Sequence, residues 1–391
     1  MSLSLTNATY TSHARARDQV HKGRGAALNL EGRFEQWQRA VFEDGWNDGR
    51  HEPTDEETET VPLKTVITRE TAKSIISENN SPDIPFRYSL NPYRGCEHGC
   101  IYCFARPTHA YLGLSPGLDF ETRIFAKVNA PQLLRAELSK PGFRSEVICL
   151  GIITDAYQPC EREYAITRQC LQIMSEFNQP VGLITKSALI ERDLDILVPM
   201  AKRNLVHVTI SVTTQNHHIS RYLEPRTAAP ARRMQTIKRL AEAGIPVGIN
   251  VAPVIPFLTD HELETLLEQG RDMGAATAGY VMLRLPWELK TLFRNWLEIH
   301  FPLKAAHVMS RVQEMSGGKD YDAEFGTRIV GQGVFAELLK QRFAKACARL
   351  DLNNRGRREI QRLDASQFHV PGHPDLRPAP NRARASAAIP D

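Results

Sequence analysis

The sequence of 391 residues contains no apolar run of about 18 residues or more, which is the length that a membrane-spanning helix needs. Its first residues lack the apolar core of a secretory signal peptide, and residues 1–17 instead form a basic stretch rich in serine and threonine. No internal repeat of fixed period is present. From these absences we expect a cytoplasmic protein with no membrane partner and no repeat architecture.

Cysteine is scarce, and neither sign of charge dominates. Of the seven cysteines, three lie close together, so they cannot pair evenly, and nothing indicates secretion; a disulfide framework is therefore not expected. The 49 Lys and Arg residues are nearly balanced by 45 Asp and Glu, which gives a net charge of +4. This weak basicity permits an anionic partner without requiring one. The hydrophobic fraction of 42% is that of an ordinary globular protein.

The most informative stretch is a cluster of cysteines at Cys-x3-Cys-x2-Cys spacing, followed by an aromatic residue: Cys96, Cys100, Cys103 and Phe104. A tight loop can aim three thiolates at one point. There they can ligate three irons of a [4Fe–4S] cluster and leave the fourth iron open for a substrate or cosubstrate. A zinc site is the alternative, with His98 or His109 as the fourth ligand.

Around this motif, short apolar runs alternate with segments of helical period. The expected strands are 86–90, which precedes the motif, and 146–153, 181–185, 206–212, 247–251 and 280–283. The last five are each followed by an expected helix, at 163–177, 188–203, 231–243, 260–273 and 289–300. Such alternation predicts a parallel sheet with right-handed crossovers, and the strand count is too small for a closed eight-stranded barrel. The pattern leaves a partial barrel and a doubly wound sheet both open.

The remaining segments are expected to be additions to this core. Short helices are expected over 30–46 and 70–78 on the N-terminal side, and over 302–315 and 335–350 on the C-terminal side. The last forty residues are rich in arginine and proline and are expected to be flexible. The predicted units are a partly flexible N-terminal extension (1–80), the core (81–300), a C-terminal helical extension (301–352) and a flexible basic tail (353–391).

The cysteine spacing resembles that of the radical S-adenosylmethionine (SAM) superfamily. Further segments resemble its branch related to spore photoproduct lyase, and the likeness extends from residue 86 to about 345. These segments are Thr154-Asp155-x-Tyr157-Gln158-Pro159-x-Glu161, Ile184-Thr-Lys186-Ser, Ser211-Val-Thr-Thr214, Glu224-Pro225-Arg226 and Tyr321-Asp-x-x-Phe-Gly. The resemblance implies an α/β fold, a partial (β/α)6 TIM-like barrel. It also implies a [4Fe–4S] cluster on the three cysteines, with SAM on the open iron.

In this family an electron from the cluster cleaves SAM to a 5′-deoxyadenosyl radical that abstracts hydrogen, so the resemblance implies an external donor of the flavodoxin or ferredoxin type. In parallel α/β folds, site residues lie at the carboxyl ends of strands, and polar residues stand there in this sequence. We expect these SAM contacts: Lys186 for the carboxylate, Ser211 and Asp155 for the amino or ribose groups, Glu224 for the ribose, and Tyr102 and Phe104 as the wall of the adenine. Nearby Arg232 and Arg233 are candidates for an anionic substrate group.

Each of these residues also has a structural interpretation. An aspartate at a strand end often caps a helix, a lysine there is usually solvated, and Glu224 with its arginines can form a surface pair.

The sequence departs from the dimer-repair members of the branch at their hydrogen donor. Those members are thought to use a cysteine near the end of the second strand, where this chain has Ile152. Cys160, in the loop that follows, is the candidate catalytic radical partner. The absence of a second Cys-x2-Cys motif argues against members with an auxiliary cluster. We therefore expect hydrogen abstraction from an unidentified substrate, with nucleic acid favoured. The alternative is a non-catalytic iron–sulfur or zinc module that binds nucleic acid through the arginine-rich tail.

Overall fold

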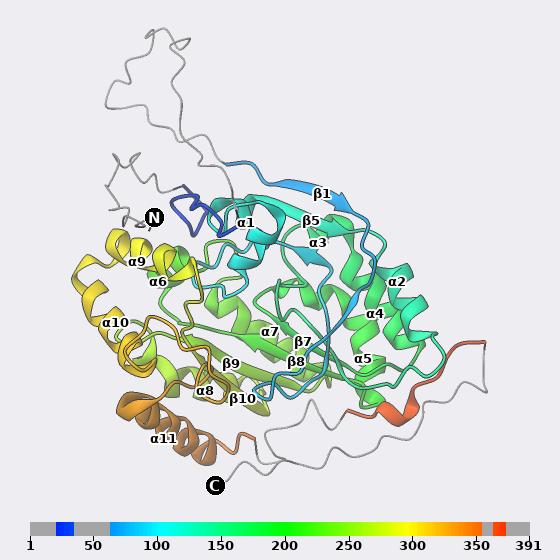
Figure 1. The fold of residues 1–391 in the computed structure, drawn as a ribbon. Coiled ribbons are helices and arrows are strands. Elements are labelled where there is room, and N and C mark those ends of the chain that lie inside the picture. Colours follow the sequence, from blue (N-terminus) through cyan, green and yellow to red (C-terminus); the bar gives the residue numbers. More distant parts are fainter. Residues whose placement is uncertain (1–20, 35–62, 354–362, 373–391) are drawn as a thin grey trace, which may run out of the picture.

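Six parallel strands that follow one another in chain order form the centre of the molecule (Figure 1). The computed structural model describes residues 21–34, 63–353 and 363–372. The main sheet has the order β10-β9-β8-β7-β6-β3-β2, with β2 antiparallel to β3 and all other neighbours parallel. A doubly wound sheet reverses its strand order at one point, and this sheet does not. The predicted α/β fold, a partial TIM-like barrel, is confirmed.

The strands of the main sheet are short and mostly buried, as expected for parallel strands. They are β2 Ile76–Glu78, β3 Tyr88–Leu90, β6 Ile148–Leu150, β7 Val181–Thr185, β8 Val206–Ser211, β9 Val247–Val254 and β10 Thr277–Met282. Strand β7 has the predicted bounds, whereas β6 ends three residues early. Gly151 turns the chain there at φ +83°, and a Cβ at that position would lie 2.0 Å from the Ile184 carbonyl oxygen. The chain therefore leaves the sheet at Gly151.

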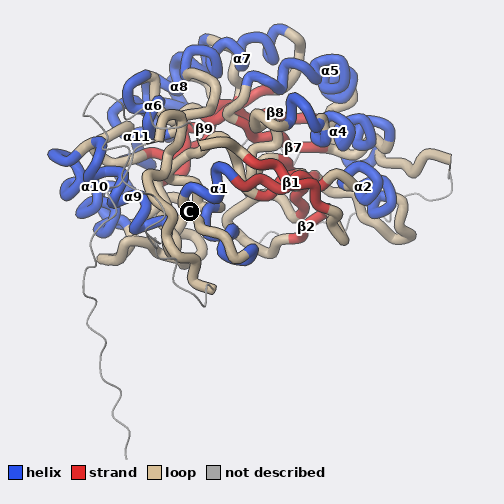
Figure 2. The backbone as a smooth tube through the Cα atoms, turned by 90° about the horizontal axis from the view of Figure 1, so that it is seen from above, coloured by secondary structure: helices blue, strands red, loops and turns tan. Residues whose placement is uncertain are grey.

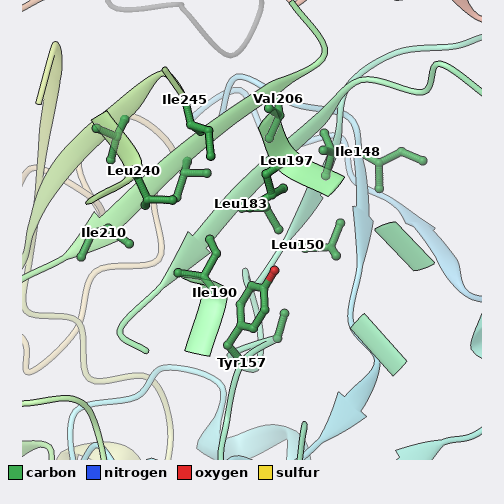
Figure 3. Packing of buried hydrophobic residues seen from close by; sticks show 14 of the residues in the cluster. Ile148, Leu150, Tyr157, Leu183, Ile190, Leu197, Val206, Ile210, Leu240 and Ile245 are labelled. Carbon is green, nitrogen blue, oxygen red and sulfur yellow. The ribbon is translucent and has the colours of Figure 1, made fainter. Parts of the chain in front are cut away.

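The crossover helices lie in an arc outside the strands, which Figure 2 shows from above. They are α2 Ala130–Leu138, α4 Ile166–Glu176, α5 Leu194–Lys202, α7 Pro230–Glu242 and α8 Leu263–Asp272. Aliphatic side chains from these helices meet those of the strands in the main core, where Leu197 and Leu240 pack near Leu183, Val206 and Ile210 (Figure 3). Burial of these apolar side chains is the main source of the sheet's stability.

A second, three-stranded sheet was not predicted. It consists of β1 Val66–Glu70, β5 Arg123–Lys127 and β4 Tyr93–Arg94, in the order β1-β5-β4. The helix predicted over 70–78 is wrong, because this stretch ends β1 and then forms β2, whose Ile76 pairs with Leu90. Pairing with a distant strand outweighed the local pattern. The helix predicted over 30–46 falls mostly on residues 35–62, outside the described residues.

Short helical segments flank the cysteine motif and the loops that follow the strands. They are the 3₁₀ turns η1 Arg106–Leu112, η2 Ala188–Asp193, η3 Asp260–Glu262 and η5 Ala365–Gln367, and the short helices α1 Leu118–Thr122, α3 Glu161–Tyr164 and α6 His217–Leu223.

Three longer helices complete the described chain: α9 Leu289–His300, α10 Pro302–Met315 and α11 Gly333–Arg349. Helices α9 and α10 have the predicted bounds. Residues 363–372 return to the core, where Phe368 is 5% exposed and packs against Phe143 and Phe177. The four predicted unit boundaries stay predictions. Within the described ranges, no helix has the length and apolarity needed to cross a membrane.

Candidate functional site

The three cysteines of the motif lie together in the loop that follows β4. All three thiols are free, and Cys96 and Cys100 are 7% and 8% exposed. Burial raises the pKa of the Cys96 thiol well above its ordinary value, and negative charge on Asp155, Cys100 and Cys103 raises it further. Burial likewise raises the pKa of the Cys100 and Cys103 thiols. Three thiols this close together, two of them buried, can become thiolates together only with a cationic group between them.

Each of the two histidines of the zinc alternative has one ring nitrogen held by a protein group, and His109 Nδ1 has no hydrogen-bond partner among the described residues. His98 Nδ1 lies 3.3 Å from an Asp155 carboxylate oxygen, and His109 Nε2 lies 3.0 Å from the Arg123 carbonyl oxygen. Among the described residues, no group of three or more His, Cys, Asp or Glu is arranged to hold a metal ion. A [4Fe–4S] cluster spreads its protein ligands over three irons, so the three thiols fit it better than they fit one zinc ion.

A buried arginine sets the shape of the cysteine loop. Arg106 is fully buried and donates hydrogen bonds of 2.9 Å to the carbonyl oxygens of Gly99 and Cys100. Its guanidinium also pairs with the Glu121 carboxylate at 2.5 Å. The loop carbonyls are thereby turned toward Arg106.

Residues 21–34, which we call the N-terminal strap, lie across the cysteine loop. The backbone N–H groups of Gly25 and Ala26 each donate to the Glu121 carboxylate at 2.9 Å. A Cβ on Gly25 would lie 1.9 Å from the Gly99 carbonyl oxygen, so only glycine fits against the loop at this position. From the sequence this stretch was assigned to the N-terminal extension, and its contact with the cysteine motif was missed.

The loop after β6 holds the other side of the motif. Gln158 accepts a hydrogen bond from Glu97 N at 2.9 Å and donates to the Gly95 carbonyl oxygen at 3.2 Å. The Cys160 N–H donates to the Glu97 carboxylate at 2.7 Å, and Cys160 is 5% exposed within the main core. Burial and the Glu97 charge raise the pKa of the Cys160 thiol. The structure thus places Cys160 next to the motif, and its catalytic role stays a prediction.

Asp155 joins the end of β7 to the motif. One carboxylate oxygen accepts from Thr185 Oγ1 at 2.7 Å, and the other accepts from Lys186 N at 2.8 Å and lies beside His98. Burial by itself would raise the pKa of Asp155, but His98 and these hydrogen bonds lower it to about 2. Asp155 is therefore a carboxylate whose oxygens are largely engaged by protein groups.

Glu224 lies at the end of α6, behind the cysteine loop. It is 2% exposed, accepts hydrogen bonds from Tyr102 and Thr213, and pairs with Arg233, which is 1% exposed. Burial would raise the pKa of Glu224, but Arg233 and Lys186 lower it to about 2. The expectation that Arg233 faces an anionic substrate is wrong, because its guanidinium is buried against Glu224. Its neighbour Arg232 pairs with Glu191 on η2.

Lys186 retains hydrogen-bonding capacity. Its Nζ donates to the Ala252 carbonyl oxygen at 3.2 Å and lies 3.8 Å from Glu224 and 5.8 Å from the centre of the Tyr102 ring. An ammonium group has three donors, so Lys186 can still bind an anionic ligand. It stands beside the cysteine loop, in the loops at the carboxyl ends of the parallel strands, which we call the mouth.

Ser211 and Phe104 complete the predicted set. Ser211 ends β8 and is 3% exposed, and its carbonyl oxygen accepts from Arg233 at 2.9 Å. Phe104 carries the guanidinium of Arg284 over its ring, with Cζ 4.4 Å from the ring centre. The structure therefore gathers Tyr102, Asp155, Lys186 and Glu224 around the motif. Arg106 and Glu121, which hold the loop, were missed, because their partners lie in segments that no sequence pattern connects.

Comparisons with known proteins agree with this geometry. The family sequence model of the radical SAM superfamily matches residues 90–270 of this chain. An uncharacterised protein of Mycobacterium tuberculosis (strain ATCC 25618 / H37Rv) is 37% identical over 238 residues, which is 60% of this chain and 69% of that protein. An uncharacterised protein of Methanocaldococcus jannaschii is 25% identical over 216 residues, which is 55% of this chain and 77% of that protein.

Solved structures of similar fold include mutants of spore photoproduct lyase. One aligns with a TM-score of 0.53 at 14% identity, over 73% of this chain and 79% of that protein. Another, with bound AdoMet and dinucleoside spore photoproduct, aligns with a TM-score of 0.52 at 13% identity over the same shares, 73% and 79%. At such identities the likeness concerns the fold alone.

Proposed function

Because this chain belongs to the radical SAM superfamily, we propose that it is an enzyme that holds a [4Fe–4S] cluster on Cys96, Cys100 and Cys103 and cleaves SAM reductively. One electron supplied by the cluster would divide SAM into methionine and a 5′-deoxyadenosyl radical. The radical would then take a hydrogen atom from the substrate. The electron would come from a flavodoxin or ferredoxin.

The main support for this proposal is that three free thiols, two of them buried, lie beside a cation at the mouth. Three cysteine thiols suit a cluster with an open iron, and the structure groups no fourth ligand with them among the described residues. Lys186 stands beside them with donors to spare, and we assign it to the carboxylate of SAM. A purely structural iron or zinc site has no need of such a cation, so the pairing favours an enzyme over a binding module.

The other predicted residues take supporting roles in this proposal. Glu224 holds the Tyr102 hydroxyl and lies beside Lys186, so it would act on SAM through these two side chains. Asp155 would fix the start of the loop that carries Lys186, because it accepts the Lys186 N–H. Ser211 is assigned to the polar groups of SAM, and Phe104 with Tyr102 to the adenine. Cys160 remains the candidate radical partner.

For the substrate we propose a nucleic acid. The arginine-rich end of the sequence and the net charge of +4 are compatible with such a partner. One fold neighbour was solved with a dinucleoside photoproduct, which is a property of that protein. The decisive measurement is transfer of deuterium from a labelled nucleic acid into 5′-deoxyadenosine.

The enzyme proposal is tested by anaerobic reconstitution with iron and sulfide. We expect about four irons and four sulfides per chain, and slow formation of 5′-deoxyadenosine from SAM with dithionite. Alanine at Cys96, Cys100 or Cys103 should abolish both. The matched control is Cys149→Ala, which removes a buried thiol on β6 and should keep the cluster. Protein that takes up only zinc, or that holds a full cluster and leaves SAM intact, would contradict the proposal.

A further inference from the structure

Arg284 is a cation at the mouth that the chemistry above does not use. It follows β10, which forms one edge of the main sheet, and its guanidinium stacks on Phe104, the residue after Cys103. Strands β8 and β9 lie between β10 and β7, the strand that leads to Lys186. Arg284 and Lys186 therefore approach the cysteine loop from different strands.

Within the described part of the chain, the Arg284 guanidinium makes no hydrogen bond and no ion pair. The two arginines that hold the site behave differently. Arg106 donates to four carbonyl oxygens and pairs with Glu121. Arg233 donates to two carbonyl oxygens and pairs with Glu224. The Arg284 nitrogens are not among the buried polar atoms that lack a partner, so its guanidinium, unlike the other two, keeps its donors free for a ligand that arrives from solvent.

The groups around Arg284 form a small polar pocket that includes Tyr321, Asp322 and Arg328. Two of its charges already have partners. Arg328 pairs with Asp83 at 2.5 Å, and the Asp322 carboxylate accepts from Thr327 Oγ1 at 2.7 Å. Burial lowers the pKa of Arg284, which agrees with a charge that lacks a close counter-ion. The pocket thus presents, beside the cysteine loop, a guanidinium that no carboxylate of the described residues pairs with directly.

We propose that Arg284 binds an oxyanion of the substrate, a phosphate or a carboxylate, and so positions the substrate beside the cysteine loop. A guanidinium offers parallel N–H donors that match the oxygens of either group, and Phe104 fixes its plane. The assignment to the substrate rests on the proposed function, in which Lys186 serves the carboxylate of SAM. The binding of an oxyanion at Arg284 can be measured without any turnover.

The test is site-resolved labelling with phenylglyoxal, a reagent that modifies accessible guanidinium groups. The reconstituted holoprotein is labelled first without SAM and then, saturated with SAM, alone, with inorganic phosphate and with succinate, at matched ionic strength. Mass spectrometry then gives the labelling rate of each arginine. Arg349 is the matched control, since it is 58% exposed and pairs with Glu268 on the surface.

We expect phosphate or succinate to slow labelling of Arg284 in a saturable way and to leave Arg349 unaffected. At twice its dissociation constant, the anion should slow labelling about threefold by mass action. Protection by phosphate alone identifies a phosphate-bearing substrate, and protection by succinate alone a carboxylate-bearing one. The same protein is assayed for 5′-deoxyadenosine, so that a failed enzyme proposal is distinguished from a failed oxyanion site.

Three results would overturn the inference. Arg284 does not react at all, which means that no ligand can reach it. Neither anion protects it. SAM alone protects it fully against reagent and leaves no effect for either anion, which assigns the guanidinium to the cofactor.

Discussion

The buried ion pair between Arg233 and Glu224 is expected to be the largest single electrostatic contribution to the stability of the site. Replacing Arg233 with methionine keeps much of the side-chain volume and removes the charge. The Glu224 carboxylate, 2% exposed, then loses its closest cation. The carbonyl oxygens of Ser211 and Ala228 lose donors at 2.9 and 2.8 Å.

The magnitude follows from these contacts. Removing one partner of a buried ion pair costs about 3–5 kcal/mol, because an uncompensated charge stays behind. Lys186, whose Nζ lies 3.8 Å from Glu224, offsets part of this loss. We therefore expect Arg233→Met to lower the free energy of unfolding by about 3 kcal/mol, at the lower end of that range. The pKa of Glu224 should rise, since Arg233 is the main influence that holds it down to about 2.

The assay is urea unfolding followed by tryptophan fluorescence, with Arg232→Met as the matched control. Arg232 is the adjacent residue, and its side chain is 37% exposed where it pairs with Glu191. A pair of that kind contributes about 0–1 kcal/mol, so the control should lose little. The double variant Arg233→Met/Glu224→Gln should be less destabilised than the sum of its single changes. A loss below about 1 kcal/mol for Arg233→Met, or strict additivity in the double variant, would refute the reasoning.

Three further predictions concern the strap, the SAM site and acid stability. Gly25→Ala should lower the iron content of reconstituted protein, because its Cβ would lie 1.9 Å from the Gly99 carbonyl oxygen. Gly142→Ala strains its own backbone at φ +79° but meets nothing within 4 Å, so it should keep full iron content and controls for loss of a glycine as such. Equal iron in both variants would contradict a role for the strap. Lys186→Ala should weaken SAM binding in equilibrium dialysis by about 1.5–3 kcal/mol and keep the cluster, and unchanged affinity would remove Lys186 from the site. For Glu191, hydrogen bonds from two arginines and a threonine outweigh the effect of burial and lower its pKa. Its contribution to stability is therefore complete above its unfolded pKa of about 4.3 and is lost as the pH falls through its lower folded pKa. The urea midpoints of wild type and Glu191→Gln should therefore differ by a constant amount from pH 7 to about 5 and converge in more acid solution; a difference that widens there would have the wrong sign.

The elements that a local sequence pattern determines were predicted correctly. Strand β7 is a continuous apolar run, and its bounds were predicted correctly. The sheet β1-β5-β4 was missed, because Val66 pairs with Arg123, far along the chain, and most of the β1 side chains are exposed. A strand without an apolar pattern can be predicted only when the strand that pairs with it is known.

The site residues likewise fall into those that the sequence predicts and those whose role appears only in the folded chain. The cysteine spacing and the strand-end position of Lys186 are sufficient to predict that the three thiols and this lysine lie together at the mouth. The roles of Arg106 and Glu121 depend on contacts with loop carbonyls and with the strap, and no spacing rule encodes such contacts. That Arg284 lacks a hydrogen-bonding partner among the described residues is also a property of the folded chain alone, since the sequence does not show which acidic side chains lie near it.

The N-terminal strap enlarges the part of the chain that would be needed to hold the proposed cluster. The family model begins at residue 90, yet Glu121 receives two N–H donors from residues some 95 positions earlier in the chain. A shortened protein that starts near residue 81 would keep every cysteine and would still expose the back of the loop, with the Glu121 carboxylate short of two donors. During synthesis the strap also emerges before the cysteine loop, so its N–H groups have no acceptor until Glu121 has been made. The cysteine loop is therefore completed by a segment far upstream of it. Protein expressed without the strap is expected to lose iron.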